Sequence, residues 1–299
     1  YKRDLKHHKD RVIVGSETFC SDARKFWRIA KEHPALIGDF VWAGMDYLGE
    51  VGIGAWEYAD YAPDFTGGVG WRGASAGRLD LTGRAWAETA YTQVAFDLTP
   101  VAIGVVRPDR AFEKHSPSAW RMSNALESWS WDGCDGKETM VEVYTTCPRA
   151  AVYVNGKKVG EKKVGKDARA YFKVVYHPGE LVAAGIDKKG NEVCRIVLKS
   201  AGEKTTQLRA LPEFESIKRG DLCYIRLQYT DVNGVWKPLV RGEIKVSVEG
   251  GELLALGSAC PYNEQGYHRD ATDTYFGEAL AIIRPAKGAE KITLNAESG

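Results

Sequence analysis

The sequence predicts a multidomain fold, with an α/β region over residues 1–100 followed by all-β structure up to residue 299. Three observations predict it. Short apolar runs in the first part alternate with segments whose apolar residues recur at helical spacing. Beyond residue 117 the apolar spacing changes to two, with frequent turn signals. The length, 299 residues, is enough for about two or three domains, each with its own core.

The α/β region begins with a β-branched run at 11–15, which predicts a strand. A helix is expected next, capped by Ser21 and ended by Pro34. The run 36–42 predicts a second strand, and the intervening helix allows the two strands to be parallel. A Gly- and aromatic-rich loop, 45–83, leads to a last helix. The apolar faces of the two helices are Ala23, Phe26, Trp27 and Ala30, then Trp86, Ala90, Tyr91 and Val94.

Two parallel strands and two helices do not make a complete parallel sheet. Such sheets are covered by helices on both faces or closed into a barrel, and the strand at 11–15 would otherwise expose an apolar edge. We therefore expect further strands, which either an upstream portion of the protein or a companion chain supplies.

The all-β part follows a linker expected at 101–117, which contains Pro108. Turn signals such as Asn155-Gly156, Pro178-Gly179 and Asn233-Gly234 separate short alternating runs. Two immunoglobulin-like β-sandwiches, at 118–200 and 201–299, fit this spacing. The expected strands are 129–131, 139–145, 149–154, 170–176 and 180–184, then 222–229, 243–248, 252–256 and 291–294.

Composition excludes several classes of partner. The net charge is +1, from 41 basic and 40 acidic side chains, so no overall field favours nucleic acid or anionic lipid. No apolar run is long enough to span a bilayer. Six widely spaced cysteines contain no C-x-x-C pair, and no acidic cluster has metal-ligand spacing. We expect a soluble chain with no metal and no cofactor.

Two strand ends carry candidate site residues. Glu17 follows the first strand, where catalytic groups lie in (β/α)8 barrels; the alternative is a solvated glutamate near a helix N-terminus. Trp42 and Asp46 follow the second strand, and a tryptophan there could stack on a sugar ring. The alternative for this pair is a core tryptophan beside surface acids.

Taken together, these segments resemble a known family. Val14-Gly15-Ser16-Glu17-Thr18-Phe19 and the stretch 38–50 are similar to the seventh and eighth βα units of glycoside hydrolase family 2 β-galactosidases. Residues 77–83, 152–160 and 178–183 resemble later segments of that family. The resemblance implies the C-terminal part of a (β/α)8 TIM barrel, with strands 7 and 8, followed by two immunoglobulin-like β-sandwiches. It also implies a missing N-terminal barrel portion.

The resemblance further implies a retaining mechanism. Glu17 would be the nucleophile that forms a glycosyl-enzyme, and the acid/base glutamate would lie upstream of this chain, which is inactive alone. Trp42 would stack on the sugar and Asp46 would face the substrate. Trp71, Arg72 and Ser75 lie in the variable loop and are further substrate-binding candidates. The implied substrate is a β-galactoside or oligosaccharide.

Alternatives remain within and outside this family. Members that accept glucuronides carry an Asn-x-Lys pair near 72–82, which is missing here and favours a neutral sugar, although Arg72 or Arg78 could receive a carboxylate. A β-mannosidase is a further alternative. The rival from another class is a non-catalytic carbohydrate-binding or structural sandwich module. Cytoplasmic and secreted bacterial locations, and a homo-oligomer, stay open.

Overall fold

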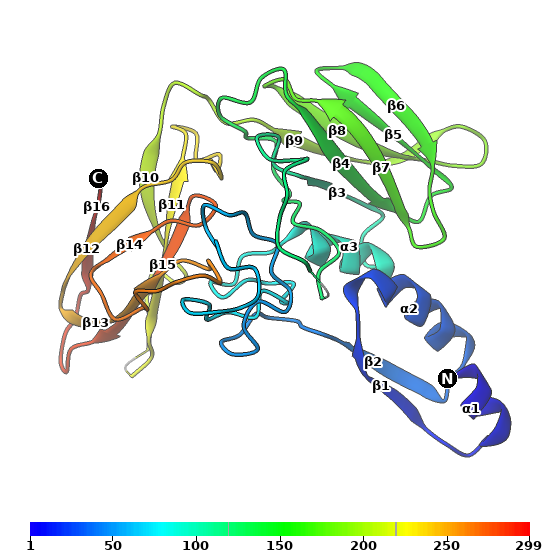
Figure 1. Ribbon diagram of the computed structural model, residues 1–299, viewed down its shortest axis with the longest axis horizontal. Helices are drawn as coiled ribbons and strands as arrows, with labels where there is room; N and C mark the ends of the chain where they lie inside the picture. The colour runs from blue at the N-terminus through cyan, green and yellow to red at the C-terminus, as the bar shows by residue number, and fades with distance from the viewer. Residues whose placement is uncertain (119, 219) are drawn as a thin grey trace.

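The computed structural model describes residues 1–118, 120–218 and 220–299. A short helix α1 (Lys2–His7) precedes strands β1 (Ile13–Thr18) and β2 (Leu36–Val41), which pair in parallel at one end of the molecule (Figure 1). The 3₁₀ turn η1 (Cys20–Asp22) and helix α2 (Ala23–Glu32) connect them. The predicted βαβ order is confirmed. The predicted cap is wrong, because Ser21 lies inside η1 and α2 begins after Asp22 without a side-chain cap bond.

The β1–β2 sheet leaves apolar side chains on its surface. Val14 is 49% exposed, Ile37 69% and Phe40 67%. Neighbouring strands or helices normally cover such side chains in parallel sheets. Two strands and one packed helix do not cover both faces here, as the sequence led us to expect.

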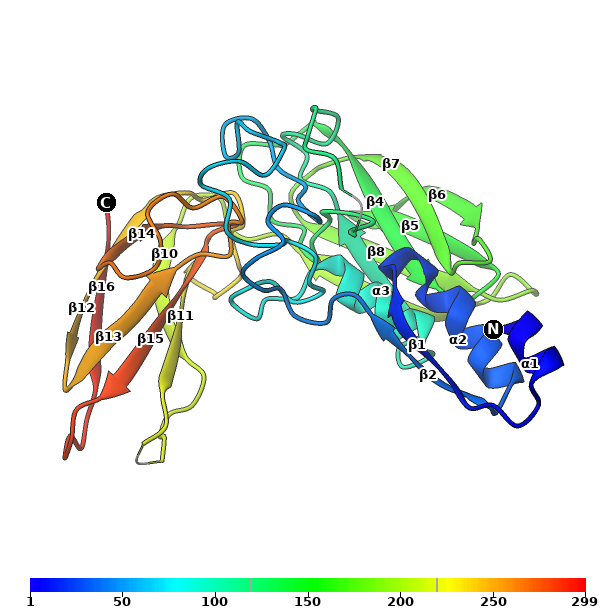
Figure 2. The ribbon, with the colours of Figure 1, turned by 60° about the horizontal axis from the view of Figure 1, so that its bottom comes forward.

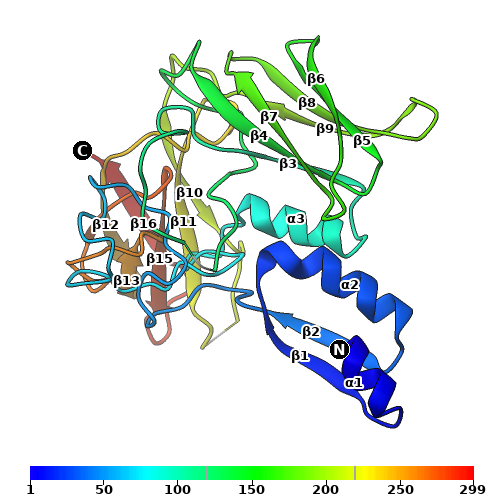
Figure 3. The same ribbon diagram turned by 45° about the vertical axis from the view of Figure 1, so that its right-hand side comes forward.

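Helix α3 (Ala87–Ala95) joins the α/β region to the first sandwich. It lies between α2 and the sheet that follows (Figure 3). Its buried face is the predicted one, with Ala90, Tyr91 and Val94 inside, whereas Trp86 is the residue just before the helix. Long loops over residues 42–86 lie beside the second sandwich (Figure 1).

The first sandwich has two antiparallel sheets. One has the order β3-β4-β7 and the other β6-β5-β8-β9. The linker expected at 101–117 begins later than predicted, because 101–105 is a fully buried strand paired along its whole length with β4. The strands are β3 (Val101–Val105), β4 (Glu138–Thr145), β5 (Arg149–Val154), β6 (Lys157–Lys163), β7 (Arg169–Val175), β8 (Glu180–Ile186) and β9 (Glu192–Lys199).

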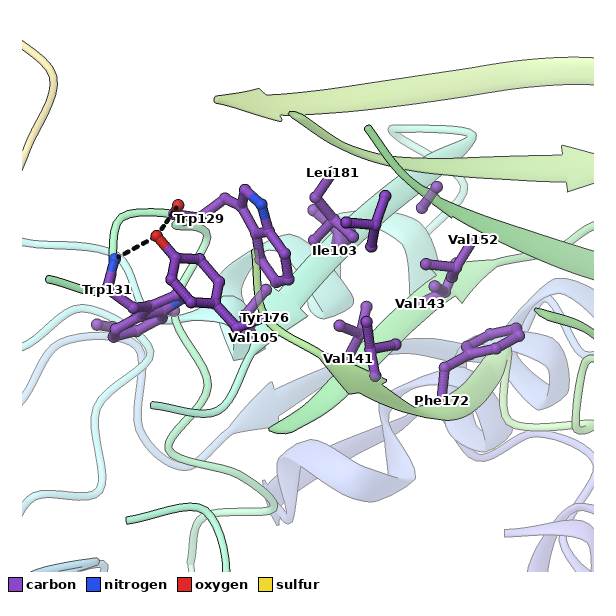
Figure 4. Packing of buried hydrophobic residues seen from close by; sticks show 14 of the residues in the cluster. Ile103, Val105, Trp129, Trp131, Val141, Val143, Val152, Phe172, Tyr176 and Leu181 are labelled. Carbon is purple, nitrogen blue, oxygen red and sulfur yellow. Dashed lines mark hydrogen bonds between the residues drawn. The ribbon is translucent and has the colours of Figure 1, made fainter. Parts of the chain in front are cut away.

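Valines from both sheets, with Ile103 and Leu181, form the core of this sandwich together with aromatic rings such as Phe172 (Figure 4). The strand expected at 129–131 is wrong: Trp129 and Trp131 are fully buried, but neither belongs to a strand. The Trp131 backbone N–H donates to the Tyr176 hydroxyl at 3.2 Å, and the Trp129 indole donates to the His177 carbonyl at 3.0 Å. The hydrogen bonds of this segment are therefore made with a side-chain hydroxyl and a carbonyl in place of a neighbouring strand.

The second sandwich, at the C-terminal end, also has two antiparallel sheets (Figure 2). Their orders are β10-β11-β15-β13 and β14-β12-β16. Ile225, Leu227, Ile244, Leu256 and Ile283 are among its core residues. The strands are β10 (Gln207–Pro212), β11 (Cys223–Thr230), β12 (Glu243–Glu249), β13 (Gly251–Gly257), β14 (Ala271–Asp273), β15 (Glu278–Pro285) and β16 (Thr293–Ser298).

Buried charges fasten the loop region to the second sandwich. Arg84 lies 2.8 Å from Asp80 and 3.1 Å from Glu278 of β15, and all three side chains are at most 7% exposed. The guanidinium also stacks on the Trp86 ring, with its carbon 4.4 Å from the ring centroid. The loop that shapes one end of the α/β region is thus held by the C-terminal domain.

No helix in the described ranges is both long and apolar enough to cross a membrane.

Candidate active site

Parallel pairing brings Glu17 and Trp42 to one edge of the β1–β2 sheet. The backbone N–H of Trp42 donates to the Thr18 carbonyl at 2.9 Å, which continues the ladder past the end of β2. Glu17 immediately precedes Thr18 and its side chain is exposed. The structure therefore places the carboxylate and the indole-bearing residue on adjacent strands at their C-terminal ends, where barrel enzymes carry their catalytic groups.

The close approach of the two strands requires Gly15. A Cβ atom there would lie 1.9 Å from Oδ1 of Asp39, its partner in the ladder. Asp39 accepts a hydrogen bond from the Thr18 hydroxyl at 2.9 Å. This carboxylate thus fixes the residue next to Glu17, and any side chain at position 15 would displace it.

A hydrogen-bond chain holds the Trp42 ring. Its indole N–H donates to the Tyr47 hydroxyl at 3.1 Å, and that hydroxyl donates to the Glu50 carboxylate. The two rings meet edge to face, with centroids 5.7 Å apart. Burial and the bond to Glu50 raise the pKa of Tyr47 to about 12, so the hydroxyl keeps its proton at neutral pH and the chain stays intact.

Arg78 holds the backbone on the other side of Trp42. This side chain is buried, and one guanidinium nitrogen lies 2.9 Å from the Trp42 carbonyl. The Arg78 backbone N–H also donates to the Ala43 carbonyl at 2.9 Å. The peptide bond between Trp42 and Ala43 is cis. Side-chain and backbone contacts therefore both fix where the indole lies.

Asp46 lies close to Ser75, but its side chain is buried instead of facing open space. It is 7% exposed, and its Oδ1 accepts the backbone N–H of Ala76 at 3.1 Å. Burial raises the Asp46 pKa, although backbone hydrogen bonds partly oppose the shift. Ser75 is buried with φ of 58°, an uncommon conformation for a residue with a side chain. The bond from Ala76 to Asp46 therefore holds the loop against the segment that follows β2.

Trp71 and Arg72 contact the second sandwich. Trp71 is 6% exposed and packs edge to face against Tyr262, with ring centroids 5.9 Å apart. Arg72 donates to the backbone carbonyls of Asn263 and Glu264, at 2.5 and 3.1 Å. The structure thus groups Glu17 with Trp42, and Asp46 with Ser75, while Trp71 and Arg72 form an interdomain contact.

Trp120 contacts the segment just after β1, which the sequence pattern did not indicate. Its ring packs at a tilt against Phe19, two residues after Glu17, with centroids 4.3 Å apart. Residue 120 lies in an irregular segment with no periodicity, so only the tertiary structure brings it to the end of β1. Phe19 itself is 41% exposed. The aromatic pair therefore lies just beyond the end of β1.

No group of three or more possible metal-ligating side chains occurs within 1–118, 120–218 and 220–299.

The protein thus combines an α/β region with two β-sandwiches. Two adjacent strands of the α/β region carry Glu17 and Trp42 at their C-terminal ends. Two family models match parts of the chain. The glycoside hydrolase family 2 C-terminal domain 5 matches residues 208–299, and a domain of unknown function, DUF4982, matches residues 136–194.

Known proteins match nearly the whole chain. A β-galactosidase of Bacteroides ovatus is 20% identical over 276 residues, which are 90% of this chain and 28% of that protein. The crystal structure of a glycosyl hydrolase family 2 member from Bacteroides cellulosilyticus superposes with a TM-score of 0.83 at 28% identity, over 100% of this chain and 39% of that one. A β-glycosidase from Bacteroides vulgatus shares the fold, with a TM-score of 0.63 at 23% identity, over 92% of this chain and 31% of that one.

Residues 208–299 match a glycoside hydrolase family 2 domain, and the chain as a whole is similar to the C-terminal portion of members of that family. It spans only 28% of the curated relative and 39% of the similar crystal structure.

Proposed function

We propose that this chain is part of a retaining β-glycosidase whose nucleophile is Glu17. The observation that supports this most directly is the placement of an exposed carboxylate at the end of β1, beside Trp42 at the end of β2. The proposed setting is the C-terminal part of a (β/α)8 barrel, whose other strands would cover the exposed apolar side chains of β1 and β2.

In the proposed reaction a Glu17 oxygen attacks the anomeric carbon of the sugar. The bond to the leaving oxygen breaks while a second carboxylic acid gives that oxygen a proton, and a glycosyl ester forms. Water then attacks the same carbon, gives its proton to the second carboxylate and releases Glu17. The second group, about 5 Å from the first in retaining enzymes, would come from an upstream strand of the same barrel.

We further propose a neutral sugar, galactose, as the substrate. Of the two arginines that could receive a sugar carboxylate, Arg72 binds backbone carbonyls of the second sandwich, and Arg78 is buried with one nitrogen on the Trp42 carbonyl. The named relative is a β-galactosidase. Trp42 supplies an aromatic surface suited to the apolar face of such a ring.

The decisive test is Glu17→Gln in the full-length protein, assayed on an aryl β-galactoside. Loss of the nucleophile should lower kcat by at least about a thousandfold, because no glycosyl ester can form. The matched control is Glu32→Gln, an exposed glutamate of α2, which should leave kcat unchanged. Turnover near the wild-type rate in Glu17→Gln would contradict the proposal, and preference for an aryl β-glucuronide would contradict the choice of sugar.

A further inference from the structure

A polar cavity of about 260 Å³ lies where the loop region meets the second sandwich. Its walls come from the loop after β2, which gives Asp60 and Tyr61, the start of β12, the loop after β13, and β14. It contains no residue of β1 or β2. The cavity is slightly smaller than the usual range for drug-sized ligands, which suits a ligand of one or two small rings.

Hydrogen bonds fix the walls of the cavity in advance. Asp60 receives two hydrogen bonds from Arg110. In the loop after β13, the Asn263 side chain closes a turn by accepting the backbone N–H groups of Gln265 and Gly266 at 3.1 and 2.9 Å. Arg72, in the loop after β2, donates a hydrogen bond to the backbone carbonyl of the same asparagine. A site with walls held in this way loses little entropy when a ligand binds.

The charges of the lining favour a neutral ligand. Four carboxylates line the cavity, those of Asp60, Glu243, Glu264 and Asp273, against one guanidinium, that of Arg241. An anionic ligand would meet net repulsion, whereas sugar hydroxyls can donate to carboxylates and accept from arginine. The four acids do not form a metal-binding group among the described residues.

Arg241 and Asp273 present a charged donor and a charged acceptor side by side. The guanidinium lies over the Tyr61 ring at 4.3 Å, and its nearest nitrogen is 4.0 Å from Oδ2 of Asp273, a loose ion pair. That separation is too long for a hydrogen bond. A sugar hydroxyl that approaches from the side could accept from the arginine and donate to the carboxylate. Tyr262 adds an aromatic edge to the wall.

We infer that this cavity is a second carbohydrate-binding site, which takes one or two residues of a neutral glycan. The choice of galactose as its sugar rests on the proposed function, but the existence of the site does not. A ligand here would touch both the loop after β2 and the second sandwich.

The test measures binding of methyl β-galactoside and a β-galactobiose to the full-length protein carrying Glu17→Gln, by ligand-observed NMR and calorimetry. We expect saturable, millimolar binding. The double variant Arg241→Ala with Asp273→Ala should weaken it at least about tenfold, because the hydroxyl loses a charged donor and a charged acceptor. Both side chains are largely exposed, so the fold should survive, which circular dichroism checks.

Controls separate this site from others. Glu252→Gln, an exposed acid of β13 in the same sandwich, should leave the affinity unchanged. The absence of saturable binding, equal weakening by Glu252→Gln, or tighter binding of galacturonate or calcium than of the neutral sugars would overturn the inference. If binding is lost in Trp42→Ala but kept in the double variant, the inference fails while the proposed catalytic function stands.

Discussion

Glu57 is a buried glutamate whose pKa lies above the ordinary value for this side chain. Its side chain is 1% exposed, and the Tyr275 hydroxyl donates to its carboxylate. Burial raises the Glu57 pKa to about 7, although the bond from Tyr275 and nearby arginines partly oppose the shift. The unfolded chain would have the ordinary value of 4.5. Between these two values the folded protein keeps a proton that the unfolded chain releases.

That difference predicts a pH dependence of stability. Because the folded-state pKa is raised, the Glu57 contribution is present below pH 4.5 and is lost as pH rises to about 7. The loss should reach about 3 kcal/mol in the free energy of unfolding. Urea unfolding at a series of pH values should show a steeper fall in wild type than in Glu57→Gln. The exposed Glu290→Gln should behave as wild type, and parallel curves for all three would contradict the assignment.

Lys237 is a buried cation surrounded by oxygen atoms. Its side chain is fully buried, and Nζ lies 2.8 Å from Asp132, 2.8 Å from the Thr205 carbonyl and 2.9 Å from the Thr206 hydroxyl. These partners come from the first sandwich and from the connection between the sandwiches. A buried charge persists only when it is paired and hydrogen-bonded in this way.

Replacing this lysine should therefore be costly. Lys237→Met leaves Asp132 and several carbonyls without their donor, and we expect the free energy of unfolding to fall by about 3 kcal/mol or more. Lys245→Met, on an exposed face of β12, is the matched control and should change it by less than about 0.5 kcal/mol. Chemical denaturation measures both free energies of unfolding. Equal small effects would show that the contacts of Lys237 with the surrounding oxygen atoms do not stabilise the fold.

At the scale of elements, Asp97 ties α2 to the end of α3. It accepts hydrogen bonds from Arg24 and Lys31 at 2.5 Å each and from the Trp27 indole at 2.9 Å. Burial alone would raise the Asp97 pKa, but these three donors outweigh it and lower the pKa to about 2. One carboxylate thus gathers three side chains of the neighbouring helix.

Asp97→Asn should loosen this helix pair. Because the folded-state pKa is lowered, the stabilisation is present above the ordinary value of 3.8 and is lost as pH falls towards 2. The side chain is 38% exposed, so solvent screening limits the effect to about 1 kcal/mol at neutral pH. Thermal unfolding of wild type and variant at pH 7 and near pH 2 should differ only at the higher pH. A difference that persists at low pH would point to packing instead.

The elements that sequence predicted are those with a clear apolar period. The β1–α2–β2 order and a strand such as β5 follow directly from alternating or helical spacing. Strand β15 was missed because Glu278-Ala279-Leu280-Ala281 consists of helix-forming residues, although Ala279 and Ala281 are fully buried in the sheet. Residues 129–131 were predicted as a strand but do not form one. Their aromatic residues are typical of strands, but hydrogen bonds to the Tyr176 hydroxyl and the His177 carbonyl hold them instead.

At the scale of the whole molecule, the candidate site was only partly predictable. Adjacency of Glu17 and Trp42 follows from parallel strands and could be foreseen. The positions of Trp71 and Arg72 could not, because their partners lie about 190 positions further along the chain and no local pattern records such a contact. The same holds for Trp120 beside Phe19. Loops are positioned by distant domains, and sequence spacing carries no signal for that.

The ion pairs between the loop region and the second sandwich predict coupling between these parts. Glu278→Gln removes the charge that faces Arg84 and Arg226, and should lower the free energy of unfolding by about 3 kcal/mol. The control is the exposed ion pair of Glu252 with Arg284. Glu252→Gln should change the free energy of unfolding by less than about 1 kcal/mol. Urea unfolding that gives equal values for both would contradict the coupling.

Arg84 also limits how the gene for this protein can be recombined. Consider a hybrid that keeps residues 1–206 but takes its final sandwich from a relative without an acid equivalent to Glu278. The buried guanidinium of Arg84 would then lose its ion pair with that sandwich. Successful chimaeras should therefore place their crossover upstream of residue 42, so that the loop region and the last domain are inherited as one block. Libraries with crossovers at residue 206 and before residue 42 would reveal this as a difference in the yield of soluble protein.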